Sequence, residues 1–391
     1  MNKWEMKPLG QLCLIERGGS PRPIDKYITD SPDGINWIKI GDTTESMYIT
    51  NTKEKIIPEG MKKSRYVQRG DFLLSNSMSF GRPYILDIDG CIHDGWLVIR
   101  DTSNLFDKRF LYYFLGSPNT YQKFKSMAVG GVVNNLNIDM VKKVEVPVLS
   151  MSEQKEIADS LDKVTALISS RKAQLEKLDL LVKSRFIEMF GDPVINPKSW
   201  EIAPLSSLIV TANNGMARRG KDNDGSIVLR LVELQNGYID YAEPNRISLT
   251  EAEEKRYRLK ENDFLFARVN GNPDYVGRCA VFNEISEPVY HNDHIIRVHF
   301  DENKINGCFT SVLLNSDYGK RQMREQIKTS AGQYTISQDG IGGIMTILPP
   351  LDLQNEFATF VEQTDKLKFE VKEALEKLET LKKSLMQQYF G

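Results

Sequence analysis

Residues 147–191 read PVLSMSEQKEIADSLDKVTALISSRKAQLEKLDLLVKSRFIEMFG, and residues 347–391 read ILPPLDLQNEFATFVEQTDKLKFEVKEALEKLETLKKSLMQQYFG. Identical residues in the two stretches are separated by a constant 354 − 154 = 200 positions, as Gln154 and Gln354 are. A constant offset over so long a stretch indicates an internal duplication. The other identical pairs begin at Glu156, Leu175, Leu178, Leu181, Ser184, Phe190 and Gly191.

The repeat extends more loosely through the rest of each half. Trp4-Glu5 recurs as Trp200-Glu201, and Asp71-Phe72-Leu73 recurs as Asp263-Phe264-Leu265. The offset in these segments lies below 200, which places small insertions in loops. We therefore expect two similar globular domains, each followed by its own copy of the repeated segment.

The repeated segments have the pattern of long amphipathic helices. Ser150 with Glu153 three residues later forms a possible capping box at the start. Gly191 and Pro193 are typical of a helix end. The apolar positions of the two copies follow steps of three and four residues, typical of a heptad stripe; they are Ile157, Leu161, Val164, Ile168, Leu175, Leu178 and Val182, then Phe357, Val361, Val371, Leu375, Leu378 and Leu385.

Two such stripes most simply bury each other. Because each globular segment precedes its helix, a pseudo-twofold arrangement pairs the helices antiparallel. The alternative is that each helix packs only on its own globular segment, without a separating rod. The predicted fold class is α+β, with two similar globular domains, residues 1–150 and 192–350, separated by two antiparallel coiled-coil helices, residues 151–191 and 351–391.

The globular segments have a mixed α and β pattern. Short apolar runs predict strands, and longer amphipathic runs predict helices. In the first segment we expect strands over 35–40 and 70–75 and a helix over 110–127. In the second we expect strands over 227–232 and 263–268 and a helix over 309–327.

Composition is that of an ordinary globular protein, with 391 residues, 40% hydrophobic, 27% charged and a net charge of −2. Four scattered cysteines form no zinc-type or disulfide framework, which favours a reducing compartment. No apolar run approaches the length of a membrane span. We expect a cytoplasmic protein with no membrane contact. Residues 1–150 carry only 20 basic against 17 acidic side chains. If the chain binds DNA, its positive charge must therefore gather on one face, or a partner must supply it.

Catalytic motifs are missing from the sequence. No glycine frame surrounds the four Lys-Ser/Thr pairs, so no phosphate-binding loop is present. Asn272-Pro273-Asp274-Tyr275 approaches the adenine methyltransferase tetrapeptide but lacks its second proline, and we interpret it as a loop turn. The E-x-K triplets, which resemble part of a nuclease site, have no paired acid.

Four histidines come closest to a metal or catalytic cluster. His291 and His294 bracket Asn-Asp in a strand-like stretch, and His299 follows, while the first copy has only His93 there. A duplicated metal site would appear in both copies. We therefore interpret these histidines as polar residues at a strand end and predict no metal site and no catalytic residue.

Loops in both segments are rich in donors that read base edges and phosphates. The first copy has a glycine-rich loop, and the second has Asn213-Asn-Gly215-Met-Ala-Arg218 with further basic residues. Arg can fork to guanine and Asn to adenine, each contributing about 1–3 kcal/mol of discrimination. The candidate DNA-binding residues are Arg17, Gly18, Gly19, Ser20, Arg22, Lys39, Asn76, Ser77, Arg82 and Lys125, then Arg218, Arg219, Lys221, Arg268, Asn270, Arg278 and Arg321.

Taken in order, several motifs resemble one family over essentially the whole chain. These are Gly18-Gly-Ser-Pro-Arg22, Trp37-Ile-Lys-Ile-Gly-Asp42, Gly70-Asp-Phe-Leu73, the Gln154 helix and Met189-Phe-Gly-Asp-Pro193. With the duplication, the chain resembles the DNA-specificity subunit of type I restriction–modification systems. The Pro-Pro-Leu-x-Glu-Gln helix start of that family is complete in neither copy.

The resemblance implies two target recognition domains that each read half of a bipartite double-stranded DNA sequence. It implies no cofactor in this chain. Modification subunits would use S-adenosylmethionine, and restriction subunits would use ATP and Mg. The helices would set the gap and dock the modification subunits, and the chain itself would not be an enzyme. Two rival hypotheses remain: a coiled-coil scaffold joining two protein-binding domains, and an enzyme with unrecognised motifs.

Overall fold

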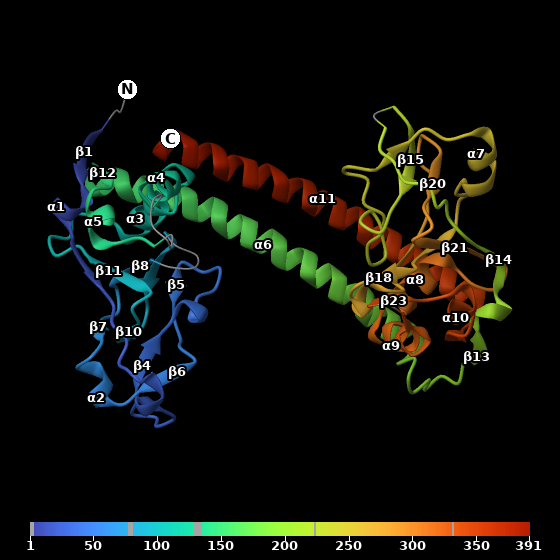
Figure 1. Ribbon diagram of the computed structural model, residues 1–391, viewed down its shortest axis with the longest axis horizontal. Helices are drawn as coiled ribbons and strands as arrows, with labels where there is room; N and C mark the ends of the chain where they lie inside the picture. The colour runs from blue at the N-terminus through green and yellow to red at the C-terminus, as the bar shows by residue number, and fades with distance from the viewer. Residues whose placement is uncertain (1–3, 77–80, 129–134, 223, 331) are drawn as a thin grey trace. The chain divides into compact units, whose positions relative to one another are not determined.

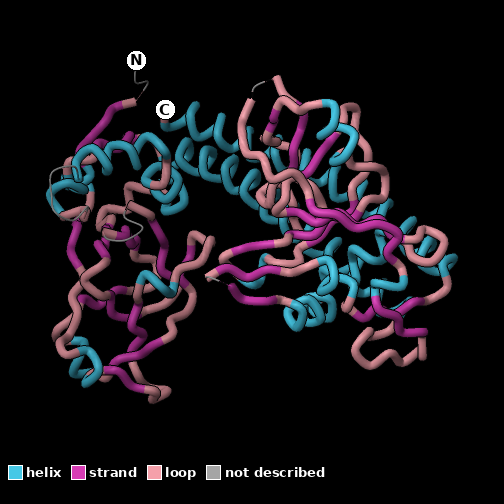
Figure 2. The backbone as a smooth tube through the Cα atoms, turned by 45° about the vertical axis from the view of Figure 1, so that its right-hand side comes forward, coloured by secondary structure: helices cyan, strands magenta, loops and turns pink. Residues whose placement is uncertain are grey.

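The computed structural model of the chain describes residues 4–76, 81–128, 135–222, 224–330 and 332–391. It divides into two compact units, one of Met1–Lys172 with Glu373–Gly391 and one of Ala173–Lys372. Both units combine strands with short helices (Figure 2). Each unit also contains one half of each long helix, α6 (Met151–Phe190) and α11 (Leu351–Phe390). Among the described helices, none is long and apolar enough to cross a bilayer.

The first unit contains two five-stranded sheets and one two-stranded sheet. In Figure 1 the long helices lie with the short helices Lys108–Leu115, Pro118–Ala128 and Ile138–Lys142 at one end of its strands, whereas the helix Pro58–Met61 lies at the other end. One sheet has the order β2-β11-β8-β9-β5 (Leu14–Arg17, Trp96–Arg100, Phe72–Ser75, Pro83–Leu86, Tyr48–Ile49). The second has the order β3-β6-β4-β10-β7 (Ile28–Thr29, Glu54–Ile56, Ile35–Ile38, Gly90–Ile92, Arg65–Val67). The third pairs β1 (Glu5–Pro8) with β12 (Glu145–Val148). The short helices are α1 (Leu9–Leu12), α2 (Pro58–Met61), α3 (Lys108–Leu115), α4 (Pro118–Ala128) and α5 (Ile138–Lys142), with 3-10 turns at Ile24–Lys26 and Ile40–Asp42.

The second unit repeats this plan with changes. Its sheets follow the orders β14-β21-β17-β19 (Ile209–Asn214, Ile295–Phe300, Phe264–Ala267, Cys279–Val281) and β16-β15-β20 (Arg246–Ile247, Ser226–Leu229, Val289–His291). A further sheet is β18-β23-β22 (Val269–Asn270, Gln333–Thr335, Lys328–Ser330), and β13 (Glu201–Pro204) pairs with β24 (Met345–Leu348). The helices are α7 (Glu251–Tyr257), α8 (Gly307–Asn315), α9 (Asp317–Gln326) and α10 (Gln338–Gly342), with 3-10 turns at Leu205–Ser207 and Pro273–Tyr275.

The central sheet of each unit buries both of its faces. Alternate residues of a strand point to opposite faces. In β8, Phe72 and Leu74 join the core under the helices, while Leu73 joins a second core under the neighbouring sheet. In β17, Phe264 and Leu265 divide in the same way. These strands are therefore uniformly apolar, and each central sheet lies between a helical layer and a second sheet.

The helix predicted over 110–127 is two helices, α3 and α4. Gly116 caps the first, and Pro118 begins the second after Ser117, whose hydroxyl accepts a hydrogen bond from Thr120 N at 3.2 Å. The helix predicted over 309–327 is likewise α8 and α9, divided at Ser316. Serine and proline at these positions favour a new helix start over continuation. The predicted strands are present but shorter than expected.

Both ends of α6 follow the sequence signals. The Ser150 hydroxyl donates to Glu153 Oε2 at 2.7 Å, and Ser150 N donates to the same oxygen at 3.1 Å. Glu153 N donates to Ser150 Oγ at 3.3 Å, which completes the capping box. At the other end Gly191 has φ +80°, and a Cβ there would meet Pro197 at 2.6 Å. Glycine therefore ends the helix for conformational and steric reasons.

The two long helices pack antiparallel within each unit. In the second unit Lys368 pairs with Asp179 at 2.9 Å, and Arg185 pairs with Glu356 at 3.0 Å. Residues further along α6 thus pair with residues nearer the start of α11, as antiparallel helices do. In the first unit Lys172 approaches Glu379 to 4.0 Å. Helix–helix pairing is thus confirmed, although Leu175 and Leu178 of the predicted stripe are only half-buried.

Each helix also contributes to the core of both units. Ile157 and Leu161 of α6 are buried in the first unit, and Phe190 is buried in the second against Phe309, with ring centroids 4.8 Å apart. Conversely, Phe390 of α11 lies in the first unit, 5.7 Å from the rings of both Phe110 and Phe114. The alternative hypothesis, in which each helix packs only on its own globular segment, is therefore wrong.

A buried glutamine near the start of each long helix links it to the globular segment that precedes it. Gln154 Oε1 accepts from Asp107 N at 2.9 Å, and Gln154 Nε2 donates to Leu105 O at 2.8 Å and to Leu149 O at 3.1 Å.

Gln354 repeats the arrangement in the second unit. Its Oε1 accepts from Asn306 N at 2.8 Å, and its Nε2 donates to Pro349 O at 2.8 Å and Lys304 O at 3.3 Å. Both glutamines are almost fully buried. Glutamine at both 154 and 354 therefore binds one backbone N–H and two backbone carbonyls in each unit.

Replacing Gln354 with alanine should lower the free energy of unfolding of the second unit by about 1–3 kcal/mol, because buried backbone groups lose their partners. Gln154→Ala should do the same in the first unit. Urea unfolding of the whole chain, with the two transitions fitted separately, measures the loss. The matched control is Gln363→Ala, at an exposed position of α11. Equal stability of the Gln354 and Gln363 variants would contradict the prediction.

Candidate nucleic-acid interface

The glycine-rich loop of the first unit begins where β2 ends, at Arg17. Gly18 N donates to Trp96 O at 2.9 Å, and Gly19 N donates to Ile92 O at 3.1 Å. A Cβ on Gly18 would lie 2.0 Å from His93 O. Only glycine fits there, because the loop backbone lies directly on the turn between β10 and β11.

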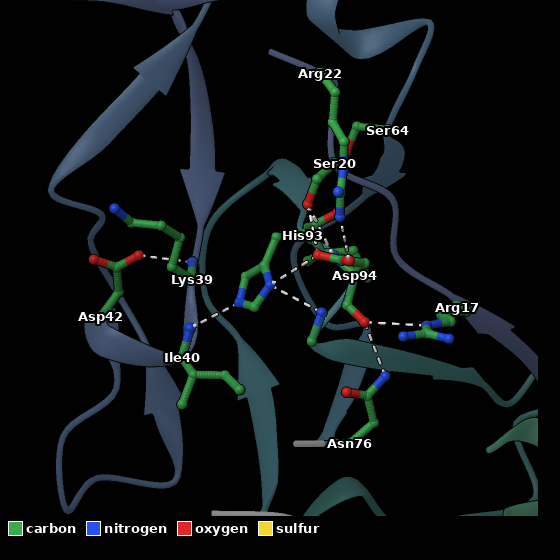
Figure 3. Close-up of polar contacts among 12 residues, drawn as sticks. Arg17, Ser20, Arg22, Lys39, Ile40, Asp42, Ser64, Asn76, His93 and Asp94 are labelled. Carbon is green, nitrogen blue, oxygen red and sulfur yellow. Dashed lines mark hydrogen bonds and ion pairs between the residues drawn. The ribbon is translucent and has the colours of Figure 1, made fainter. Parts of the chain in front are cut away.

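That turn gathers four of the predicted side chains around Asp94 (Figure 3). Arg17 Nε donates to Asp94 O at 3.1 Å, and Asn76 Nδ2 donates to the same oxygen at 2.9 Å. The Ser20 hydroxyl donates to Asp94 Oδ1 at 2.7 Å, and Arg22 Nη2 reaches Asp94 Oδ2 at 3.5 Å. The Ser20 hydrogen bond is the main reason that the pKa of Asp94 lies below its usual value.

His93, beside Asp94, connects the turn to the 3-10 turn after β4. Its Nε2 accepts from Ile40 N at 3.1 Å, as Figure 3 shows. Burial lowers the pKa of His93, which favours the neutral ring that this acceptor role requires. Lys39 N donates to Asp42 Oδ2 at 2.8 Å, and the Lys39 ammonium pairs with Glu54. Lys39 is therefore near the site but already has an acidic partner.

Strand register identifies the corresponding residues of the second unit. Ser75 pairs with Trp96 in the first unit, and Ala267 pairs with Ile295 in the second. The next residues, Asn76 and Arg268, are therefore equivalent. By the same reasoning Arg17 corresponds to Asn214, Gly18 to Gly215 and Asp94 to Asp293. Beyond the paired strands, Arg22 and Arg219 each lie four residues after that glycine, and each contacts the carboxylate of the aspartate.

Asp293 is the centre of an equivalent cluster. Arg268 Nη1 donates to Asp293 O at 3.0 Å, where Asn76 donates to Asp94 O in the first unit. Arg219 Nη1 pairs with Asp293 Oδ1 at 2.6 Å, and its Nη2 lies 3.0 Å from His294 Nε2. A Cβ on Gly215 would lie 2.3 Å from Asn292 O. Both units thus place a glycine against the turn and cationic or amide groups around an aspartate.

A second equivalent pair is Arg82 and Arg278, each next to the first residue of β9 or β19. Arg82 Nη2 donates to Thr44 O at 3.3 Å, and its guanidinium lies 5.3 Å from the Tyr84 ring. Arg278 Nη1 donates to Leu234 O at 3.3 Å, and its guanidinium lies 4.5 Å from the Tyr275 ring. A cavity of about 400 Å³ adjoins Arg278; it is lined by Leu231, Val232, Gln235, Ala267, Asn270, Tyr275 and Arg278.

The remaining predicted residues do not join either aspartate cluster, although Asn270 lines the cavity beside Arg278. Arg218 pairs with Glu253 at 2.9 Å. Asn270 lies in β18 and accepts a bond from Asn272 N at 2.9 Å. Ser77 lies outside the described residues. The exposed residues are Lys125 on α4, Arg321 on α9 and Lys221 in the loop before β15.

The sequence interpretation missed Asp94 and Asp293. Each lies next to a histidine that the sequence had singled out: Asp94 follows His93, and Asp293 precedes His294. No three His, Cys, Asp or Glu side chains of the described part of the chain gather in a way that could hold a metal. His291 ends β20, is fully buried, and lies with Nδ1 3.3 Å from Tyr257 O.

Comparisons with known proteins give the same assignment as the motifs. The sequence model of the family described as "Type I restriction modification DNA specificity domain" matches residues 1–180. The StySPI type I specificity subunit of Salmonella potsdam is 31% identical over 298 residues, 72% of this chain and 64% of that protein. The EcoKI specificity subunit of Escherichia coli K12 is 25% identical over 99% of this chain and 88% of its own length. The chain belongs to the type I specificity-subunit family.

Solved structures of specificity subunits share the fold. The S subunit from M. genitalium superposes with a TM-score of 0.59 at 15% identity, covering 100% of this chain and 97% of that one. A chain from a structure on assembly of the type I R-M system gives 0.61 at 14% identity, covering 100% and 98%. The predicted family and fold class are confirmed. As a specificity subunit, the chain is a non-catalytic component of its system.

Substituting alanine for Gly18 or Gly215 should destabilise the loop and lower the melting temperature of its unit, because the new Cβ would overlap a backbone carbonyl. Gly41→Ala and Gly271→Ala are the controls, since nothing lies within 4 Å of a Cβ at either position. Differential scanning calorimetry of the four variants compares them. Equal melting of the Gly18 and Gly41 variants would refute the steric argument.

His291 should stay neutral well below the usual histidine range. Burial, and then the charge of Arg297, lowers its pKa to about 4. Because the unfolded chain has the higher pKa, about 6.5, it takes up the proton first as pH falls. The second unit should therefore lose stability between about pH 6.5 and 4. Histidine NMR titration, with His291→Gln for assignment, measures the pKa; a His291 signal that titrates near 6.5 would be inconsistent with this burial.

Proposed function

We propose that residues 1–150 and 192–350 each read one half of a bipartite double-stranded DNA target. The observation that carries this proposal is the recurrence of the aspartate-centred cluster, built from the same strand positions, once in each unit. Arginine and asparagine are the side chains that fork to guanine and adenine. Family membership supports the proposal, since the relatives from Salmonella potsdam and Escherichia coli K12 are named specificity subunits.

The two halves of the target should differ in sequence. Equivalent positions carry different side chains: Arg17 against Asn214, Asn76 against Arg268, and Ser20 against Ala217. An arginine and an asparagine present different donor and acceptor patterns to a base edge. The shared backbone arrangement therefore supports a common docking mode, while the substituted side chains support separate specificities.

We further propose that α6 and α11 set the gap between the half-sites. A helix of 40 residues spans about 60 Å at 1.5 Å per residue. Exposed apolar side chains on these helices, such as Leu167 and Leu181, provide surfaces for modification subunits. We propose that those partners use S-adenosylmethionine, that restriction subunits use ATP with Mg, and that the assembly acts in the cytoplasm.

Exchanging residues 1–150 for the matching segment of another specificity subunit should change one half of the methylated target and leave the other half intact. Base-resolution sequencing of methylated adenines, in cells with and without this gene, measures the result. A gel shift with the purified complex on DNA tests the scaffold alternative. Absence of gene-dependent methylation together with absence of DNA binding would favour the scaffold.

Inserting four residues after Arg171, with a matched insertion after Lys372, should lengthen the helices by one turn, about 5.4 Å. The gap of the target should then widen by about one or two base pairs, because B-DNA rises about 3.4 Å per pair. The same methylation sequencing measures the gap. An unchanged target would contradict the role of the helices as spacers.

A further inference from the structure

We propose that Asp94 and Asp293 are positioning residues, each of which orients the DNA-contacting side chains for one half-site. This inference rests on the proposed function and adds the residues that organise each contact surface. The presence of an aspartate in such a surface is unexpected. A carboxylate in a DNA-binding surface repels phosphates, so electrostatics alone would favour its absence.

The contacts of Asp94 explain why it is present. Its backbone oxygen accepts from two side chains, Arg17 and Asn76, and its carboxylate accepts from Ser20 and faces Arg22. These donors come from two separate segments, the loop after β2 and the residue after β8. The turn at Asp94 therefore holds together groups that are far apart in the sequence. Its backbone oxygen orients Arg17 and Asn76, and the contacts with Ser20 and Arg22 are the ones that require the carboxylate.

The carboxylate leaves the arginine available. The Arg22 side chain is 81% exposed, and its single contact with Asp94 is 3.5 Å long. An exposed ion pair of this kind contributes little stability. Most donors of the guanidinium therefore remain free to meet a phosphate or a base, while its direction is restricted.

Asp293 performs the same task with different partners. Arg219 contacts its carboxylate at 2.6 Å and remains half-exposed, and Arg268 donates to its backbone oxygen at 3.0 Å. Each aspartate thus accompanies two arginines, Arg17 and Arg22 in one unit and Arg219 and Arg268 in the other. Each group of three side chains retains one positive charge, which suits a DNA phosphate.

The substituted positions indicate which part of the cluster is structural. The hydroxyl of Ser20 has no counterpart at Ala217, and Gly95 corresponds to His294. Three residues occur in both units: the aspartate, the loop glycine (Gly18 or Gly215) and the loop arginine (Arg22 or Arg219). The shared residues therefore hold the loop in place. The residues that differ surround the loop, at positions where they can contact the bases of each half-site.

The test measures binding by the complex of the whole chain with its modification subunits. The probe is a synthetic duplex carrying the target identified by methylation sequencing, with two further duplexes in which one half-site is scrambled. Asp94→Asn should reduce affinity for the intact target about tenfold, although it removes a negative charge. It should cause no further loss on the duplex whose first half-site is scrambled. Asp293→Asn should behave in the same way toward the other half-site.

Matched controls separate charge and folding from positioning. Asp33→Asn and Glu284→Gln remove exposed carboxylates elsewhere in the same domains and should leave binding unchanged or slightly stronger. Ser20→Ala removes the 2.7 Å bond to Asp94 without changing charge. Because alanine occupies the equivalent position 217, this variant should fold, and a smaller loss at the first half-site is expected from it.

The outcomes are distinct. Unchanged or tighter binding by Asp94→Asn, or a loss that does not depend on which half-site is scrambled, would overturn the positioning role while the DNA-binding function stands. If Asp94→Asn melts at a lower temperature, Ser20→Ala decides, and its full affinity would overturn the inference. A wild-type complex that does not discriminate the intact from the scrambled target would instead refute the proposed function.

Discussion

The buried glutamine at the start of each long helix is the contact on which the rest of the structure depends. Gln154 and Gln354 are buried, and each satisfies one backbone N–H and two backbone carbonyls. An unpaired backbone group there costs about as much as the hydrogen bond itself. The direction in which the helix leaves the globular segment is therefore fixed by three hydrogen bonds, and the apolar stripe of the helix then determines what it packs against.

The two units share this arrangement of helices and sheets but differ in the side chains of their loops. The central sheets bury both faces, so their strands have little freedom to vary. The turns at Asp94 and Asp293 lie at the ends of these strands, where side chains can change without disturbing the core. Rigid sheets under variable loops are a common solution for recognition, because the scaffold positions the loops while their side chains differ.

Much of this fold could be predicted from the sequence, because its strongest signals are local. The capping box at Ser150, the terminal Gly191 and the heptad stripe involve residues a few positions apart. The break at Ser117 and Pro118 was also local but was missed, since the apolar pattern continues across it. The Asp94 cluster could not be predicted, because its partners Arg17, Ser20 and Asn76 lie 77, 74 and 18 residues away. Only strand register brings them together, and the shared contact with the aspartate carboxylate identifies Arg219 as the counterpart of Arg22.

The position of Phe390 has a consequence for biosynthesis. Its ring fills the core of the unit that contains the first 172 residues, between Phe110 and Phe114. A ribosome releases residues 1–150 long before it reaches this phenylalanine, so the core around Phe110 and Phe114 stays incomplete until the second repeat has been synthesised. A nascent chain that stops before Phe390 would leave two aromatic rings uncovered, a feature that chaperones and proteases can detect. The core of the first unit can therefore close only after both long helices have been made.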